Sequence, residues 1–180
     1  EKTGYQLLTD QTKLSMDTVK PVTLTFTDAG RSQYLSVLCS LAGVEGARLE
    51  QKLVPQIARK LLQENFPEFE HISSGDNLNF SAYQTPDGGI ALLPYGDSDL
   101  ALSAKISPWA NDYFDLTALK YYFTRVLNDP KETRERGIIA LYGLASLGES
   151  VLREIESALK EKDLSVTEEL YLILSAAQLG

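Results

Sequence analysis

The sequence predicts a mostly α-helical fold of helix-pair repeats, like that of an α/α toroid, preceded by a short β segment. From Ser32 onward, apolar residues recur at helical spacing. A weak internal repeat also relates residues 138–148 to residues 170–180, which is typical of stacked helix pairs. We therefore expect residues 1–30 to be a β segment from a flanking β-rich domain, and residues 31–180 to form the helical region.

The β segment is predicted by an alternation of apolar and polar residues between Val22 and Thr27. Asp28-Ala29-Gly30 then reads as a turn. The chain begins at Glu1 without a methionine, which suggests a segment cut from a longer precursor.

Two helices are expected next, at residues 32–42 and 44–65, separated by Gly43. The second presents one apolar face, formed by Leu49, Leu53, Ile57 and Leu61. Pro55 lies inside this pattern and predicts a kink or a break. Residues 66–96 are rich in proline and glycine and are expected to be irregular.

Short helices are expected near residues 78–83 and over residues 98–106, the latter ending before Pro108. The last third is the most clearly helical part, and an apolar face starts at Leu116. Its boundaries are predicted by an N-cap at Asp129, a C-cap at Gly148 and the capping box Ser165-Val166-Thr167-Glu168. The final helix is apolar enough that we expect further helices after it in the parent chain.

Composition excludes several classes of function. The formal net charge is −8, which argues against binding to nucleic acid or to an anionic membrane surface. No apolar run is long enough for membrane insertion as a spanning helix. Cys39 is the single cysteine, so no internal disulfide can form, and its apolar neighbours favour a buried structural thiol.

The sequence contains no visible catalytic set. His71 is the only histidine, and we predict neither a metal site nor a cofactor. Asp97 and Asp99 could act as paired carboxylates, but helix capping is the favoured interpretation. An aromatic stretch could line a ligand groove, although core packing is more usual at this spacing; it comprises Trp109, Tyr113, Phe114, Tyr121, Tyr122 and Phe123.

The most distinctive motif runs from Gln84 through Asp87, Gly88 and Gly89 to Ile90. Asp-Gly-Gly favours a tight turn with positive φ, and the preceding proline fixes the entry into it. The motif lacks the glycine spacing and the Lys-Ser/Thr pair of a phosphate-binding loop. It therefore indicates a loop between helices, as found between the inner and outer helices of α/α toroids.

In the order of its motifs, the chain resembles the thioester domain of bacterial α2-macroglobulin-like proteins. A β segment and a short helix precede Ala47-Arg48-Leu49-Glu50-Gln51, where that family has Gly-Cys-x-Glu-Gln. The Asp87–Ile90 turn is similar to the family's Pro-Asp-Gly-Gly-aromatic turn, and the helix at residues 136–148 is similar to its helix-pair repeats. The resemblance covers roughly residues 30–180.

The departure from the family lies at the cysteine. The family's thioester joins the cysteine thiol to the glutamine side chain, and here Arg48 stands in the cysteine position while Glu50 and Gln51 are kept. Arginine cannot form this bond, so we predict no internal thioester and no covalent capture of targets. The alternative is that Glu50 and Gln51 are simply exposed helix residues.

The resemblance implies a non-catalytic domain of a larger secreted, cell-surface or periplasmic protein. Its partners would be neighbouring domains of the parent chain, and proteases or other proteins held without a covalent bond. Two alternatives stay open. One is a toroid enzyme of the terpene cyclase or prenyltransferase type, and the other is an unrelated helical-repeat interaction module.

Overall fold

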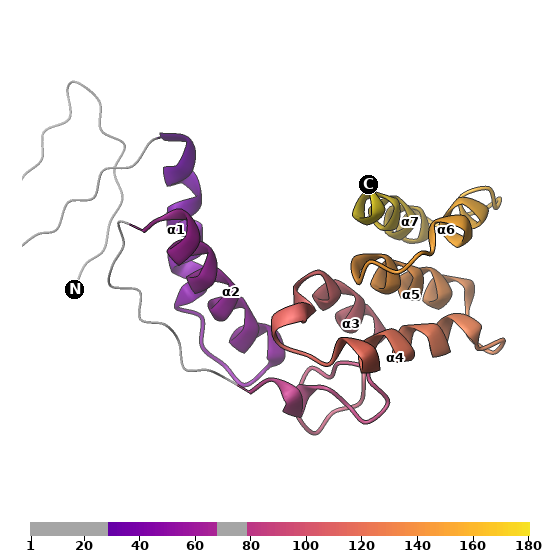
Figure 1. Cartoon of the computed structure of the whole chain (residues 1–180), viewed down its shortest axis with the longest axis horizontal. Helices are drawn as coiled ribbons and strands as arrows, with labels where there is room; N and C mark the ends of the chain where they lie inside the picture. Colours follow the sequence, from indigo (N-terminus) through magenta and orange to yellow (C-terminus); the bar gives the residue numbers. More distant parts are fainter. Residues whose placement is uncertain (1–28, 68–78) are drawn as a thin grey trace, which may run out of the picture. The chain divides into compact units, whose positions relative to one another are not determined.

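A computed structural model describes residues 29–67 and 79–180 of the chain. These residues fall into two compact units, residues 29–67 and residues 79–180 (Figure 1). The described residues are mostly helical, which confirms the predicted fold class. The predicted strand at residues 22–27 and His71 lie outside the described residues, whereas Ala29 and Gly30 of the predicted turn belong to the first helix. Closure into a toroid stays a prediction.

The first unit contains two helices that pack against each other, α1 (Ala29–Ala42) and α2 (Leu49–Asn65). They run antiparallel, since Arg31 near the start of α1 donates to the carbonyl of Asn65 at the end of α2. Their contact is built on a small apolar cluster of Leu35, Leu62 and Phe66. Cys39 packs against this cluster but is only partly buried, where the sequence predicted a buried thiol.

Both helices differ from their predicted bounds. Helix α1 starts three residues before Ser32, and α2 begins at Leu49 rather than at Val44. Residues 43–48 form the connection between the helices instead. Pro55 is buried inside α2 without ending it, so of the predicted kink or break the break is wrong, and the kink stays a prediction. Proline removes one hydrogen bond of the helix, and the apolar contacts of the buried face that contains Pro55 outweigh that loss.

The second unit begins with an irregular segment and short helices. A 3₁₀ turn, η1 (Ser81–Tyr83), replaces the predicted helix at residues 78–83, and the Asn79 side chain accepts a hydrogen bond from its first N–H. Helix α3 (Leu100–Ile106) follows and ends before Pro108, as the proline predicts. The 3₁₀ segment η2 (Ser107–Asp112) continues directly from it.

Four further helices complete this unit: α4 (Leu116–Asn128), α5 (Arg134–Ser146), α6 (Leu152–Ala158) and α7 (Val166–Leu179). Figure 1 shows α4, α5 and α7 as successive layers. Helix α5 is central, because it contacts α3, α4, α6 and α7, and its residues 138–145 are all buried. The side chain of Phe123 from α4 fills the space left by Gly143 of α5.

Two of the three helix caps predicted for this unit are confirmed. Ser165 and Glu168 form the expected capping box, and Gly148 ends α5 with a φ of 76°. Asp129, predicted as an N-cap, instead follows α4 and accepts a hydrogen bond from the N–H of Lys131. Thr133 caps α5 in its place, so Asp129-Pro130 opens a turn rather than a helix.

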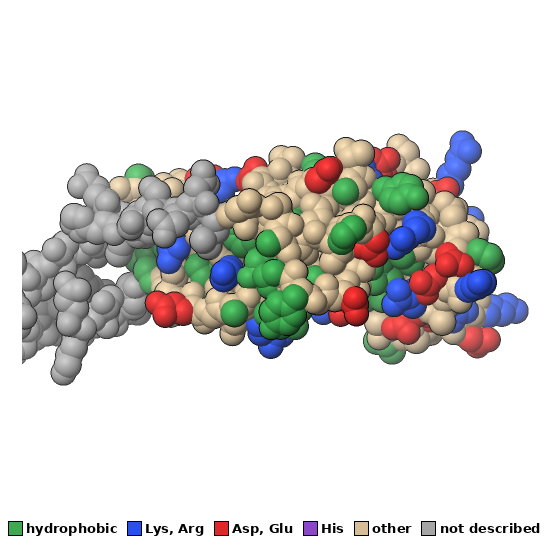
Figure 2. Space-filling view, turned by 90° about the horizontal axis from the view of Figure 1, so that it is seen from below, with side chains coloured by type: hydrophobic (Ala, Val, Ile, Leu, Met, Phe, Trp, Pro, Cys, Tyr) green, Lys and Arg blue, Asp and Glu red, His purple; other side chains and the backbone are tan. Residues whose placement is uncertain are grey.

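In Figure 2, acidic and basic side chains are intermixed with apolar ones across the face shown. Within the described residues, no helix is long and apolar enough to cross a membrane.

Candidate functional site

Arg48, Glu50 and Gln51, which the sequence resemblance would place at a thioester position, lie at the start of α2. Arg48 is the N-cap residue, in an extended conformation, and Glu50 and Gln51 occupy the first turn. The side chain of Gln51 folds back toward residue 48, where its Oε1 lies 3.3 Å from the backbone nitrogen of Arg48 and accepts its N–H. This is one half of a capping box; the other half is missing because a guanidinium has no acceptor.

Gly46 is a part of this site that the sequence reading did not single out. A Cβ at Gly46 would lie 2.0 Å from Oε1 of Gln51 and 2.3 Å from its Cδ, so a side chain there would displace the glutamine. The glycine therefore allows the glutamine to lie close to the backbone that precedes the helix. In the sequence, the feature that could have indicated this role is the Gly-Ala pair directly before Arg48.

Arg48 and Glu50 form an ion pair, with 2.7 Å between Nε and Oε1. Both side chains are substantially exposed, so the pair contributes little to stability. The carboxylate also lies in the first turn of α2, where the helix dipole favours a negative charge. The guanidinium of Arg48 is thus held locally by the carboxylate of Glu50.

The turn motif lies in the second unit and is bound to α4. Gln84 contacts the N-cap residue of α4 through two hydrogen bonds: its Nε2 donates to the carbonyl of Asp115 at 2.9 Å, and its Oε1 accepts the N–H of Asp115 at 2.8 Å. Asp115 in turn caps α4 by accepting from the N–H groups of Thr117 and Ala118. Gln84 therefore fixes the start of α4.

Asp87 is the centre of the turn. One carboxylate oxygen accepts hydrogen bonds from the Thr85 hydroxyl and the Gly89 N–H, and the other accepts from Ser98 and Arg125 at 2.9 and 3.0 Å. Partial burial raises the pKa of Asp87, but these hydrogen bonds outweigh it and hold the pKa below its usual value. The carboxyl is therefore an ionised structural acceptor.

The two glycines of the turn let it approach α4 closely. Gly88 has a φ of 90°, and a Cβ there would lie 2.1 Å from the carbonyl oxygen of Ala118. A Cβ on Gly89 would meet Ser98 and the ring of Tyr122. The predicted positive-φ turn is confirmed at Gly88, and the glycines are required by contact with α4 as well as by conformation.

The other candidate residues have structural positions. Asp99 caps α3 by accepting the Leu102 N–H at 2.7 Å, which confirms the capping interpretation for that residue, while Asp97 is exposed. Within residues 29–67 and 79–180, no group of three or more acidic, histidine or cysteine side chains could hold a metal ion.

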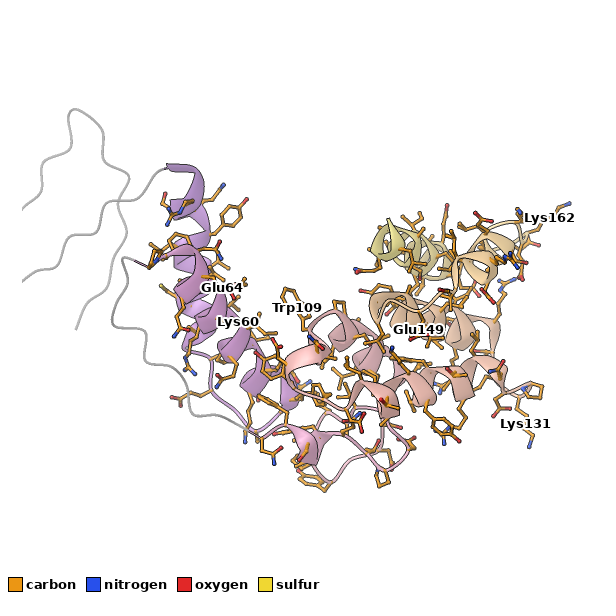
Figure 3. The ribbon with its side chains drawn as sticks, viewed as in Figure 1. Lys60, Glu64, Trp109, Lys131, Glu149 and Lys162 are labelled. Carbon is orange, nitrogen blue, oxygen red and sulfur yellow. The ribbon has the colours of Figure 1, made fainter. Side chains whose placement is uncertain are left out.

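The aromatic stretch separates into core and surface residues. Phe114, Tyr122 and Phe123 are buried, and burial raises the pKa of Tyr122. Tyr121 is exposed, and Trp109 projects from η2 (Figure 3). Consecutive residues of α4 point in different directions, so Tyr121, Tyr122 and Phe123 do not line one cavity.

Sequence reasoning missed the charged contact between α5 and α7. Arg134 forms a bidentate pair with Glu168, with Nε–Oε1 and Nη2–Oε2 distances of 2.8 and 2.9 Å, and it also donates to the carbonyl of Asp163. The capping box identified Glu168 as a cap, but nothing in the local sequence indicated its partner in the preceding repeat.

No family model, curated protein or solved structure matches this chain.

Proposed function

We propose that this chain is a non-catalytic helical domain of a larger macroglobulin-like protein, which acts by contact with other proteins and not by covalent capture. The observation that carries the proposal is the fold of Gln51 over the backbone of residue 48. In the family that the sequence resembles, the residue at this position is the cysteine that the corresponding glutamine acylates. Here the same two positions are neighbours, but one holds a guanidinium.

The local geometry supports this reading beyond the sequence pattern. Gly46 leaves the room that the glutamine side chain occupies, and Glu50 pairs with the arginine that replaces the thiol. The simple alternative, that Glu50 and Gln51 are exposed helix residues, would treat the contact of Gln51 with the backbone of Arg48 as ordinary helix capping.

The proposed partners follow from the same resemblance. They are neighbouring domains of a parent chain in an extracellular, cell-surface or periplasmic location, and proteases or other proteins that such a parent entraps. A plain helical-repeat interaction module would act in the same way, through its surfaces, and the layered α4, α5 and α7 suit that role equally.

The toroid-enzyme alternative gains no support from the turn motif. That alternative rests on the Gln84…Gly88-Gly89 turn, and the polar groups of Gln84 and Asp87 are engaged by α4 and by the turn itself.

Incubation with methylamine followed by intact-mass measurement tests the proposal. The natural chain should show no methylamine adduct. In the Arg48→Cys variant, attack of the new thiol on the Gln51 amide would release one ammonia and form a thioester, which methylamine would then open to a methylamide and a free thiol. We expect this variant to lose ammonia or to gain methylamine at Gln51.

The matched control is the double variant Arg48→Cys/Gln51→Ala, which has the thiol but no acyl group and should remain unmodified. A methylamide on Gln51 of the natural chain would overturn the claim of no covalent chemistry. An Arg48→Cys variant that is folded by circular dichroism, yet loses no ammonia and takes up no methylamine, would contradict the relationship to a thioester scaffold.

A further inference from the structure

Helices α5 and α7 are successive copies of one structural repeat. Their N-caps, Thr133 and Ser165, and the glycines that follow them, Gly148 and Gly180, are separated by the same number of residues. Both glycines have a positive φ, of 76° and 97°. The caps therefore fix one register, in which each residue of α5 has a counterpart in α7.

The inner faces of the two helices agree in this register. Ala140 and Gly143 of α5 are buried, and so are their counterparts Leu172 and Ser175 of α7. Most counterparts on the outer faces differ in exposure but are apolar in both helices. Ile138 and Leu141 of α5 are 3% and 4% exposed, whereas their counterparts on α7 are 54% and 53% exposed; these are Leu170 and Ile173.

The same contrast extends along the rest of this face. Tyr142 is buried, while its counterpart Leu174 is 38% exposed. Ala145 is buried, while its counterpart Ala177 is exposed. Helix α7 thus carries an apolar row at helical spacing that has the composition of a buried face.

The element that lies against this face of α5 is α7 itself. The rings of Tyr142 and Tyr171 are 5.5 Å apart, and Arg134 pairs with Glu168 at the other end of the contact. The exposed row on α7 is therefore the counterpart of the α5 surface against which α7 packs.

We propose that this row is a docking surface for an amphipathic helix that repeats the inner face of α7. The row is called the outer face of α7 and is formed by Val166, Leu170, Ile173 and Leu174. The docked helix would present an aliphatic residue at the position of Leu172 and a small one at the position of Ser175. The interface would continue the α5–α7 contact by one repeat.

One departure from the repeat defines the partner more closely. The counterpart of Arg134 is Val166, which is 84% exposed. A docked helix with an acid at the position of Glu168 would bury that carboxylate against valine without an arginine to pair it, which is costly. The partner helix should therefore carry an apolar residue in its first turn where α7 has Glu168.

A second copy of the chain is the less suitable occupant. The inner face of its α7 is covered by α5 and cannot be offered to another molecule. The docking proposal does not depend on the macroglobulin resemblance, since it rests on the repeat register and on burial alone.

The test extends the full chain with a second copy of residues 149–180 placed directly after Gly180, because Gly180 is the counterpart of Gly148. In the favoured extension, the residue copied from Glu168 is changed to leucine (Glu168→Leu in the added copy). Ile173→Cys, in a Cys39→Ser background, reports on the outer face through its rate of thiol modification. Glu156→Cys, on the exposed side of α6, is the matched control.

We expect the favoured extension to slow modification at position 173 by about tenfold or more, and to leave position 156 unchanged. An extension with the acid retained should protect less, and Val166→Arg in the original helix should restore protection by giving that acid a partner. Leu172→Asp in the added copy should abolish protection, which separates docking from a mere effect of added length.

Equal modification rates with and without the favoured extension would overturn the proposal. So would slow, concentration-dependent modification of the unextended chain, since a second copy would then cover the face. Equal protection by the leucine and acid extensions, with no effect of Val166→Arg, would remove the claim about the first turn of the partner.

Discussion

At the scale of single residues, two glycines of α5 offer a matched test of packing. A Cβ on Gly143 would lie 2.5 Å from the ring of Phe123, whereas a Cβ on Gly137 would meet nothing closer than Leu127 at 3.9 Å. Alanine improves helix propensity at both positions by up to about 1 kcal/mol. Only at position 143 does a buried aromatic ring oppose it.

Gly137→Ala should therefore stabilise the protein by roughly 0.5–1 kcal/mol, and Gly143→Ala should destabilise it by about 1–3 kcal/mol. Urea denaturation measures both. The double variant Gly143→Ala/Phe123→Leu should lose less stability than the sum of its single changes, because leucine vacates the space that the new methyl needs. Additive losses would show that the ring does not cause the cost.

The carboxyl of Glu168 predicts a specific pH dependence. Hydrogen bonds from Arg134 and from Ser165 lower its pKa from 4.5 to about 2. Because the folded-state pKa is depressed, the unfolded chain binds a proton more readily than the folded chain at acidic pH. The stabilisation by this carboxylate is complete above about pH 4.5 and is lost as the pH falls toward 2.

Glu168→Gln should accordingly flatten the decrease in stability between pH 4.5 and 2, relative to the unchanged protein. Chemical denaturation at a series of pH values measures this slope. Glu154→Gln, an exposed acid in the first turn of α6, is the control and should leave the slope nearly unchanged. Identical slopes for the natural protein and Glu168→Gln would contradict the depressed pKa.

Residue-level features could be predicted from the sequence where the cause is local. The capping roles of Ser165 and Asp99 and the positive φ at Gly88 each depend on a few neighbouring residues. The pairing of Arg134 with Glu168 and the fit of Phe123 against Gly143 depend on the packing of separate helices. Asp129 was misassigned because an Asp-Pro pair suits a turn as well as a helix start.

At the scale of elements, the turn from Gln84 to Ile90 is held to α4 by side chains rather than by a sheet. Within the described residues, isolated bridges join Gln84 to Ile90 and Ala91 to Ser98. The carboxylate of Asp87 accepts from four groups, one of them the guanidinium of Arg125 on α4. Removing this carboxylate should therefore loosen the whole turn.

We expect Asp87→Ala to cost about 2–4 kcal/mol, since it leaves several donors without their acceptor. Asp99→Ala removes one cap hydrogen bond and should cost only about 1 kcal/mol. Asp87→Asn keeps an acceptor for Thr85 and Gly89 but loses the charge opposite Arg125, so it should fall between the two. Equal losses for Asp87→Ala and Asp99→Ala, measured by urea denaturation, would contradict a central role for Asp87.

The elements themselves were largely predictable because their apolar spacing is regular. The first residue of α2 was not predictable in this way. Residues 44–48 were expected to be helical, but Gly46 and the extended backbone of Arg48 keep them outside the helix. The continuation of α2 through Pro55 also depends on burial of that face, which local propensity does not contain.

At the scale of the whole molecule, the repeat read from the sequence becomes the organising feature of the second unit. The pattern related residues 138–148 to residues 170–180, and the caps of α5 and α7 fall in the same register. The sequence could not predict that α5 would be covered on all sides while α7 keeps an exposed apolar row. That difference arises from which neighbours each helix has.

The central place of α5 predicts how the second unit opens. Residues 138–145 of α5 are all buried, and the helix contacts four other α-helices of this unit, so its hydrogen bonds can break only when the unit unfolds. Helix α6 buries only Ile155 among its own residues and can fray alone.

Native-state hydrogen exchange should therefore give α5 amides the largest opening free energy of the unit, equal to that of its unfolding, and α6 amides clearly smaller values. Helix α7, with one face buried and one exposed, should lie between them. Amides of α6 that exchange as slowly as those of α5, at the same urea concentration, would show that the unit opens in a single step and that α5 has no special role in holding it together.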